Sequence, residues 1–455
     1  MKSITLTALG GAREIGANSY LIRANGHEVL LDCGIHPKKE GRGALPVLSL
    51  LRRPPDAVVV THGHVDHCGA LPELLKEFPG TVPYATSATV GIMDRMLHNS
   101  VSVMGILAQE QDIAEYPLYT HEDVDYVIQS ANRMELDSPF SLDEAGSVTL
   151  SFHHAGHVLG SASILLQLEN HTLFYTGDIC TADQELMAAR TRLDGRVDVD
   201  TLIIETTYGA NQWADRISIE EETARFAEAI TKVLDRGGAV LVPAFALGRT
   251  QEMLNIIARL QEQGAIPEVP VYASGLGRAI YEVYVRYPHY LNPAATLRPL
   301  ARFGRVGDVY NRKVRRDLIR EPCILVATSG MMIEETPSSV LAEEMVHDPR
   351  HGIFFVGYLD PDTLGYKLLH AGQGDWLSFG RHRPAVKIAL EDIAGFHFGS
   401  HAPRGALRAV IKRLNPTNVV FVHGDPEAID WMHDRTGPAF CRFAPGIGEE
   451  ITLEA

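Results

Sequence analysis

Short apolar runs alternate with helix-like stretches along the first half of the chain. We expect strands at Val29–Leu31, Val58–Val60, Val148–Phe152, Leu173–Tyr175 and Leu202–Ile204. Many of these runs end at a polar or acidic residue followed by a turn, as strands do in layered α/β folds. The pattern therefore predicts an α/β protein whose chemistry lies just beyond its strand ends.

A second α/β pattern begins after Tyr208. The expected elements are helices at Ile219–Leu234 and Thr250–Gln263 and strands at Ala239–Val242, Val269–Tyr272 and Ile324–Ala327. From about His397 onward, strand-like runs at Val419–Val422 and Glu449–Leu453 indicate a return to the first layer. We therefore expect one α/β domain to be inserted within another.

Length and composition are typical of a globular protein with more than one domain. The 455 residues correspond to two or three domains of about 150 residues each. Hydrophobic residues make up 45% of the chain and charged residues 22%, which supports a sizeable core and excludes a disordered chain. Mean hydropathy is -0.03, and no apolar run approaches the roughly 18 residues of a membrane-spanning helix. Met1–Gly16 favours a first strand and turn over a signal peptide.

Charge and cysteine content restrict the partners and the compartment. The net charge of -16, from 41 basic and 57 acidic residues, requires any nucleic acid to meet a local basic patch. The most basic segment, Arg298–Arg320, fits a solvated helix face and a phosphate-facing patch equally well. Five scattered cysteines without a Cys-x-x-Cys pair indicate a reducing compartment, so we expect a cytoplasmic protein.

Four side chains of metal-ligand type lie close together after the expected strand at Val58–Val60. Residues two apart in an extended chain project to the same side, so His62 and His64 can bind one ion together. Asp66 and His67 follow where the chain turns toward a helix, and they would point to a second position beside the first. Such a polar cluster would destabilise a protein core unless it had a role. The segment therefore predicts two neighbouring metal positions.

Two later segments complete the predicted site. His157 lies in a glycine-flanked loop, and Asp178 follows the strand-like run Leu173–Tyr175, where its carboxylate could bridge two ions. Asp32 ends the strand around Val29–Leu31 and is expected to orient the histidines from behind. Nitrogen and oxygen ligands without a thiolate suit zinc in a hydrolytic site that keeps one position open for water.

These motifs resemble a known family. The pattern His62-x-His64-x-Asp66-His67, together with His157 and Asp178, resembles the metallo-β-lactamase fold. Further motifs narrow the resemblance to the β-CASP nucleases, and they lie at Leu202–Gly209, Pro243–Glu252, Ala327–Met332, Gly357–Leu359, Gly399–Ala402 and Phe421–Asp425. Within that family the motifs resemble those of the nuclease subunit of the cleavage and polyadenylation specificity factor and its prokaryotic relatives. The spacing of His397, four residues before His401, also resembles that in ribonuclease J.

The resemblance implies a fold and a set of ligands. The expected fold is an αββα sandwich, formed by residues 1–207 and 396–455, with an inserted β-CASP α/β cap domain at residues 208–395. Two zinc ions per chain are implied. The first would be held by His62, His64 and His157, and the second by Asp66, His67 and His423, with Asp178 bridging the two.

The resemblance also implies a mechanism. Two cations flanking a water molecule lower its pKa and hold a phosphate oxygen, so that hydroxide can attack the phosphorus. Asp66 is expected to be essential for catalysis. His401 is the candidate general acid that protonates the leaving alkoxide, and Glu205 would keep the His401 ring charged and oriented. Candidate substrate contacts are His397, Ser400, Ser329, Gly330 and Arg249. Ser329 and Gly330 could instead form a plain structural turn. Arg249 could instead form an ion pair with an acid of the cap domain.

RNA is the expected substrate. DNA-directed members of the family generally lack a histidine at the last motif, so His423 favours RNA, which we expect to be single-stranded. Cleavage could be internal or from an end. We expect no separate RNA-binding module before Met1 or after Ala455. Affinity would then come from the cleft, the cap or partners, in a homodimer or a nuclease assembly away from membranes.

Two other kinds of function compete with this hypothesis. The same metal site could hydrolyse a small ester or thioester, or DNA, although the inserted domain is larger than a small substrate needs. A catalytically inactive RNA-processing scaffold is the second alternative. Such scaffolds typically lose ligands, whereas every ligand position is filled here, and metal analysis would separate the two.

Overall fold

The computed structural model describes residues 4–111, 113–191, 193, 197–380 and 383–453. Contacts divide the chain into two units. Unit 1 comprises Met1–Asp183, Met187–Asp215 and Ser400–Ala455, and unit 2 comprises Gln184–Leu186 and Arg216–Gly399. The chain thus leaves unit 1 for unit 2 and later returns to it. The domain boundaries predicted from the sequence, at residues 208 and 396, remain predictions.

Unit 1 contains two mixed β-sheets. Their strand orders are β22-β1-β2-β3-β4-β5-β6 and β21-β20-β11-β10-β9-β8-β7. The strands are β1 (Ile4–Gly10), β2 (Ser19–Ala24), β3 (His27–Leu31), β4 (Ala57–Val59), β5 (Val82–Thr86), β6 (Asn132–Met134), β7 (Phe140–Ser141), β8 (Val148–His154), β9 (Ala162–Leu168), β10 (His171–Tyr175), β11 (Thr201–Glu205), β20 (Asn418–Val422), β21 (Cys441–Phe443) and β22 (Glu450–Leu453). The helices are α1 (Val65–Cys68), α2 (Leu71–Glu77), α3 (Ser87–Gln111), α4 (His121–Ser130), α11 (Arg404–Leu414) and α12 (Pro426–Arg435).

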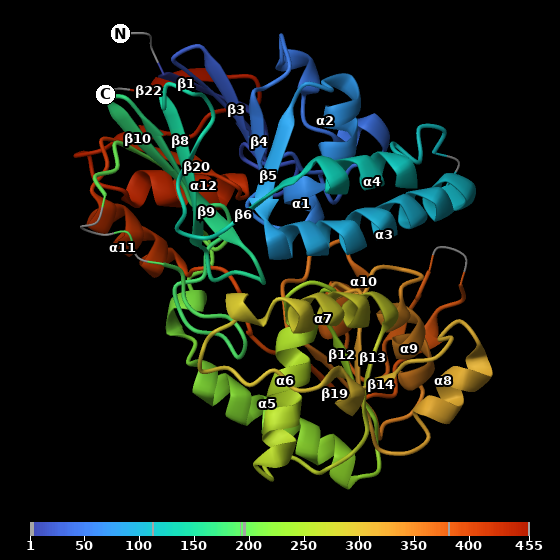
Figure 1. Cartoon of the computed structure of the whole chain (residues 1–455). Coiled ribbons are helices and arrows are strands. Elements are labelled where there is room, and N and C mark those ends of the chain that lie inside the picture. The colour runs from blue at the N-terminus through green and yellow to red at the C-terminus, as the bar shows by residue number, and fades with distance from the viewer. Residues whose placement is uncertain (1–3, 112, 192, 194–196, 381–382, 454–455) are drawn as a thin grey trace. The chain divides into compact units, whose positions relative to one another are not determined.

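The two sheets of unit 1 pack face to face and are covered by helices. Alternating side chains explain this layering, because neighbours on a strand point to opposite faces. Tyr20 and Ile22 of β2 lie in the core between the sheets, whereas Leu21 packs with the α1–α4 side. On the other sheet, Ile203 faces the inter-sheet core and Leu202 packs with α11 and α12. Figure 1 shows these helix groups on opposite sides of the sheets, which confirms the predicted αββα sandwich.

Unit 2 is built around a parallel sheet in the order β14-β13-β15-β12-β16-β19. Its strands are β12 (Val240–Pro243), β13 (Val271–Ala273), β14 (Gly304–Arg305), β15 (Ile324–Ala327), β16 (Gly352–Phe355) and β19 (Asp392–Gly395), with a separate pair β17 (Trp376–Leu377) and β18 (Val386–Lys387). The helices are α5 (Ile219–Asp235), α6 (Arg249–Glu262), α7 (Gly275–Arg286), α8 (Arg312–Leu318), α9 (Pro337–Met345) and α10 (Leu364–Leu369).

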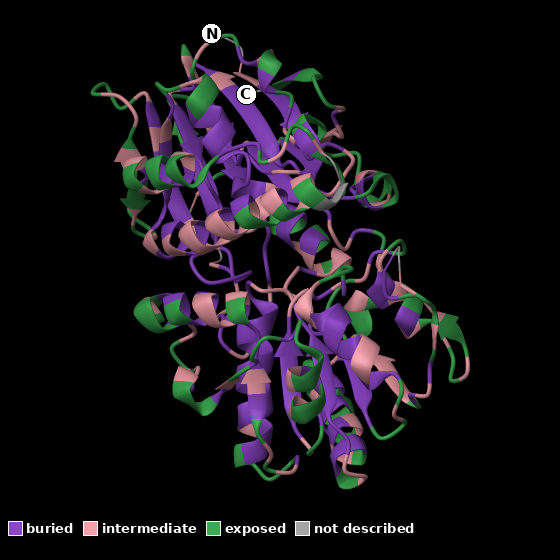
Figure 2. Cartoon of the chain, turned by 90° about the vertical axis from the view of Figure 1, so that its right-hand side faces the viewer, coloured by how far each residue is buried: buried purple, intermediate pink, exposed green. Residues whose placement is uncertain are grey.

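Helices cover both faces of this parallel sheet. Val240 and Val242 of β12 pack in one core with α5, α6 and α7, and Leu241 packs in the other with α9 and α10. Because both faces are buried, the strands are continuous apolar runs and do not alternate with polar residues. Figure 2 shows the buried strands and the exposed outer faces of the helices in each unit.

Many of the expected elements occur within a residue or two of their predicted limits. β15 matches the prediction, α5 extends one residue further, and β4 lies one residue earlier than predicted. The predicted N-terminal strand is β1, although Met1–Ser3 lies outside the described residues. In the described part of the chain, no helix is both long and apolar enough to cross a bilayer.

The basic segment Arg298–Arg320 makes many ion pairs within unit 2. Arg298 is buried and contacts Glu185 and Glu262 at 3.2 and 2.9 Å. On α8, Arg316 contacts the Glu344 carboxylate at 2.7 Å. These carboxylates neutralise part of the segment's charge, which favours a structural role for these two arginines.

Glu252 on α6 gives unit 2 a predicted pH dependence. Burial raises the pKa of this carboxyl to about 7, against the opposing effects of Arg249 and of the Leu186 N–H. The folded protein therefore binds this proton more tightly than the unfolded chain, so the stabilisation is complete below pH 4.5. It is lost as the pH rises through about 7, and amounts to about 3 kcal/mol.

We expect Glu252→Gln to remove this dependence, because glutamine resembles the protonated carboxyl. The variant should melt at the same temperature as the wild type near pH 5 and several degrees higher at pH 8.5. Thermal unfolding across this range tests the prediction, with exposed Glu228→Gln on α5 as the matched control. A constant difference between Glu252→Gln and the wild type would contradict it.

Candidate metal centre

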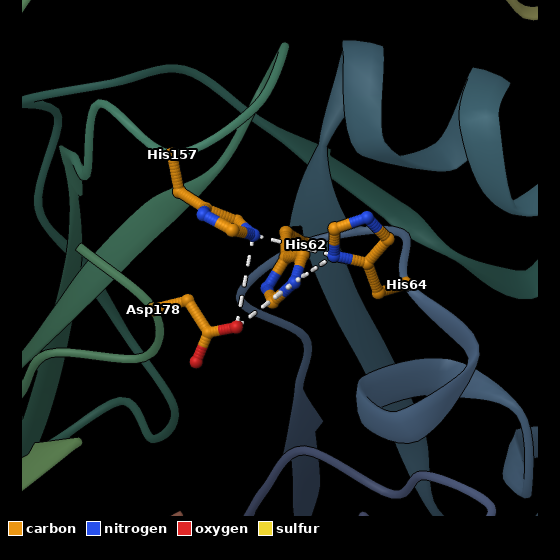
Figure 3. A group of neighbouring side chains, drawn as sticks. All are labelled: His62, His64, His157 and Asp178. Atoms are coloured by element: carbon orange, nitrogen blue, oxygen red, sulfur yellow. Dashed lines mark hydrogen bonds and ion pairs between the residues drawn. The ribbon is translucent and has the colours of Figure 1, made fainter. Parts of the chain in front are cut away.

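A first group of possible metal ligands in unit 1 consists of His62, His64, His157 and Asp178. Each offers one nitrogen or oxygen atom, and these atoms lie within 4.8 Å of one another. His62 Nε2 lies 2.9 Å from His64 Nδ1, and His157 Nε2 lies 3.3 Å from the same atom. One Asp178 oxygen, Oδ2, lies 3.6 Å from His62 Nε2. In Figure 3 the three imidazole rings and the carboxylate point toward one another.

Local structure explains how the first group assembles. β4 ends at Val59, and the extended chain beyond it carries His62 and His64 before α1 begins at Val65. Gly63 between them is tightly packed, since a Cβ there would lie 2.5 Å from the side chain of Ile92.

A second group of possible ligands, beside the first, consists of Asp66, His67 and His423. Asp66 and His67 belong to α1, and His423 follows the end of β20. Asp66 Oδ2 lies 3.3 Å from His423 Nε2 and 3.7 Å from His67 Nε2. The Asp178 Oδ2 atom that touches the first group also lies 3.4 Å from His67 Nε2, so one carboxylate reaches both groups.

Asp32 lies behind the second group. Its Oδ2 is 2.8 Å from His67 Nδ1, which leaves His67 Nε2 facing Asp66 and Asp178. Thr61 and Tyr175 donate hydrogen bonds to the same carboxylate, at 2.9 and 2.8 Å. Because a carboxylate fixes which ring nitrogen carries the proton, this contact suits the orienting role predicted for Asp32.

Two residues of this arrangement have a left-handed backbone. Asp32 has φ 58° and His423 has φ 50°. Such conformations are strained for residues other than glycine and persist where the surrounding structure holds them. Here they follow β3 and β20, the strands that deliver a carboxylate and an imidazole to the centre.

His401 and Glu205 lie at the edge of the first group. His401 Nδ1 is 3.0 Å from Glu205 Oε2, and the His401 and His157 ring centroids are 4.6 Å apart. The other carboxylate oxygen of Glu205 accepts the Ile179 N–H at 2.7 Å. Burial alone would lower the pKa of His401, but Glu205 holds it above its ordinary value. Glu205 therefore favours the protonated form of His401.

The charges within the cluster favour cations. Burial lowers the pKa of His62 and of His157 well below the ordinary value, so both rings are neutral and available as ligands. Burial alone would raise the pKa of Asp178, but His423 and His67 lower it strongly, so its carboxylate is ionised. Burial alone would lower the pKa of His423, but Asp178 raises it to about 10.

The environment of one carboxylate oxygen, Asp178 Oδ1, also suits a metal ion. Asp178 Oδ1 is buried and accepts no hydrogen bond from the described residues. A buried carboxylate oxygen needs a positive charge beside it, which the His423 ring, with Nδ1 at 3.1 Å, provides here and a metal ion could provide in its place. Imidazole and carboxylate ligands without a thiolate fit a hydrolytic metal centre.

The predicted substrate contacts are divided between the units. Ser400, in unit 1, lies beside the centre, and its carbonyl oxygen is 2.9 Å from His157 Nδ1. In unit 2, Arg249 is buried and donates to the Phe398 carbonyl at 2.6 Å, and its charge opposes the rise in the pKa of the cap-domain acid Glu252. The Ser329 hydroxyl accepts the Ile333 N–H at 3.0 Å.

The other two predicted contacts also lie in unit 2. His397 is exposed, and its backbone N–H donates to Glu222 at 2.6 Å. A Cβ at Gly330 would lie 2.8 Å from the backbone nitrogen of Phe245, so the loop after β15 is closely packed there. The roles of all five residues stay predictions.

Sequence reasoning missed several residues around the centre. Tyr175 and Thr61 contact Asp32, the Asn18 amide lies 3.1 Å from His67 Nε2, and the Thr207 hydroxyl lies 3.1 Å from His423 Nδ1. Tyr175 ends a predicted strand and Thr207 follows the predicted acid Glu205, so their positions could have signalled a role. Asn18 precedes β2 and carries no such signal.

A face-to-face pair of sheets with two histidine–carboxylate groups after its strands defines a class of metal-dependent hydrolases. Comparison with known families agrees. The metallo-beta-lactamase superfamily matches residues 12–226, the Beta-Casp domain residues 250–368, and the Zn-dependent metallo-hydrolase RNA specificity domain residues 384–436. The chain belongs to the metallo-beta-lactamase superfamily, in the branch that carries a Beta-Casp domain.

Three relatives illustrate the range of this branch. Cleavage and polyadenylation specificity factor 73 of Drosophila melanogaster is 30% identical over 93% of this chain, which spans 60% of that protein's length. Transcription termination factor FttA of Methanocaldococcus jannaschii is 31% identical over 93% of the chain and 67% of its own length. Probable RNase MJ4 of the same organism is 28% identical over 98% of the chain and 99% of its own length.

A solved structure supports the fold. A protein of unknown function from Enterococcus faecalis V583 superposes with a TM-score of 0.58 at 13% identity, covering 99% of this chain and 100% of that one. The likeness at this identity concerns the arrangement of helices and strands.

Proposed function

We propose that this protein is a zinc-dependent ribonuclease that hydrolyses phosphodiester bonds of single-stranded RNA in RNA processing or decay. The observation that carries the proposal is the position of Asp178 Oδ2, 3.6 Å from His62 Nε2 and 3.4 Å from His67 Nε2. One oxygen at such distances from both groups is suited to bridge two ions. Two cations held there would activate water as the nucleophile and would neutralise the charge that develops on a phosphate.

The residues around the ions would divide the remaining work. Under this proposal His62, His64 and His157 hold the first zinc ion, and Asp66, His67 and His423 hold the second. Asp32 orients His67. His401, kept charged by Glu205, protonates the leaving oxygen.

RNA as the substrate is supported by similarity and by chemistry. The match to an RNA specificity domain covers residues 384–436, which include His401 and His423. Of the relatives described above, one is named as a probable RNase and another as a cleavage and polyadenylation specificity factor. A small ester, a thioester or DNA would use the same ions, and an inactive scaffold would lack them. The sparse cysteines support a cytoplasmic location.

Removal of metal tests the proposal. We expect two equivalents of zinc per chain after purification in zinc, and a loss of RNA cleavage of at least about 100-fold after treatment with a chelator. Added zinc should restore cleavage. Elemental analysis and a gel assay on end-labelled RNA measure both quantities. Cleavage that persists without metal, or a chain that binds no zinc, would contradict the proposed function.

A further inference from the structure

We propose that the Thr207 hydroxyl positions His423, and so determines how tightly the second metal position of the proposed centre holds its ion. Thr207 lies two residues after Glu205, the last residue of β11, whereas His423 directly follows the end of β20. These strands pair in parallel, with Glu205 opposite Val422. The two residues therefore meet at the same edge of the sheet, from segments more than 200 positions apart in the sequence.

The backbones of the two segments are tightly joined. The Thr206 N–H donates to the His423 carbonyl at 3.2 Å, and the Thr206 hydroxyl donates to the Val422 carbonyl at 3.0 Å. A Cβ at Gly424 would lie only 2.2 Å from the Thr206 hydroxyl. Thr206 thus fixes the backbone around His423, including its left-handed φ of 50°, and leaves the orientation of the ring to other contacts.

Thr207 provides the contact that orients the ring. Its hydroxyl oxygen lies 3.1 Å from His423 Nδ1 and 3.4 Å from the His423 carbonyl oxygen. The hydroxyl can accept the Nδ1 proton while donating its own proton to that carbonyl. A single side chain would then hold both the ring and the backbone of His423, and with the proton on Nδ1, Nε2 is free to bind an ion beside Asp66.

Asp178 is the competing acceptor for this proton. Its Oδ1 also lies 3.1 Å from His423 Nδ1, but the contact does not have the geometry of a hydrogen bond. If Thr207 takes the proton, the Asp178 carboxylate remains available for the ions. Thr207 therefore acts through His423 as a positioning residue, because its hydroxyl contacts both the ring and the carbonyl of that histidine.

Thr207→Val tests this inference, since valine keeps the shape of threonine and removes the hydroxyl. We expect the second zinc equivalent to bind about 10- to 100-fold more weakly in the variant, and the first equivalent to bind as in the wild type. Thr207→Ser should recover most of the affinity because it restores the hydroxyl. Competition with a chromophoric chelator measures both dissociation constants without recourse to activity.

The controls separate this inference from the proposed function on which it rests. Thr223→Val on α5, whose hydroxyl donates to the Ile219 carbonyl, should bind both equivalents normally. If Thr207→Val does not fold, Thr207→Ala is measured in its place. Equal binding by wild type and Thr207→Val, weakening of both equivalents, or failure of Thr207→Ser to recover affinity would overturn the role of Thr207. A wild type that binds no zinc would instead overturn the proposed centre.

Discussion

Asp66→Ala is expected to lower RNA cleavage by about a thousandfold or more while the fold is retained. Loss of this carboxylate removes a proposed ligand of the second ion, and the charge stabilisation supplied by a paired ion corresponds to several kcal/mol in the transition state. The fold should survive because the contacts of Asp66 with Asn18 use its backbone carbonyl, which accepts the Asn18 N–H at 2.9 Å. Its carboxylate, in contrast, lies 3.3 Å from His423 Nε2.

Zinc content and melting temperature complete this experiment. Asp66→Ala should keep the first zinc equivalent and lose most of the second. Asp235→Ala, an exposed carboxylate at the end of α5, provides the matched control and should cleave normally. Normal cleavage by Asp66→Ala would exclude the residue from the proposed centre.

His401→Ala is expected to slow RNA cleavage by about 100- to 10,000-fold, the range that general acids contribute. The contact with Glu205 occupies Nδ1, so Nε2 remains to deliver a proton. An RNA alkoxide leaves poorly without that proton. A nitrophenyl phosphodiester releases a stable phenolate, so the same variant should lose less than roughly tenfold on this substrate.

The comparison of the two substrates decides between an acid and a ligand. A general acid affects only the substrate that needs a proton, whereas a metal ligand affects both. His401 also lies within reach of Asp178 and Glu205 in a third group that could hold an ion, so zinc content is measured in parallel. Equal losses on both substrates, or loss of zinc, would contradict the acid assignment. His347→Ala, an exposed histidine in unit 2, is the control.

Much of the fold could be predicted because strand cores leave a strong local signal. The continuous apolar runs of β11 and β15 predicted buried strands, and the change of pattern after Tyr208 predicted the inserted unit. Helix α3 was missed, although Met93, Leu97 and Val101 pack in the core at helical spacing.

The candidate ligands could be predicted because four of them share one short segment. Such a cluster of histidine and aspartate side chains is rare outside metal sites. The distant His423 was predicted from the resemblance to the family's last motif. The residues behind them could not be predicted in this way. Asn18, Thr61 and Thr207 are ordinary polar residues in sequence, and only the pairing of strands brings their side chains to the histidines.

The most direct test compares zinc-loaded wild type and Asp66→Ala on end-labelled single-stranded RNA and on DNA of the same sequence, resolved on a denaturing gel. We expect the wild type to cut RNA in a zinc-dependent way, to cut DNA at least about 100-fold more slowly, and Asp66→Ala to leave RNA intact. The product ladder would also separate internal cleavage from degradation from an end. Uncut RNA with zinc-loaded wild type, or equal cutting by the variant, would contradict the assignment of a two-zinc ribonuclease.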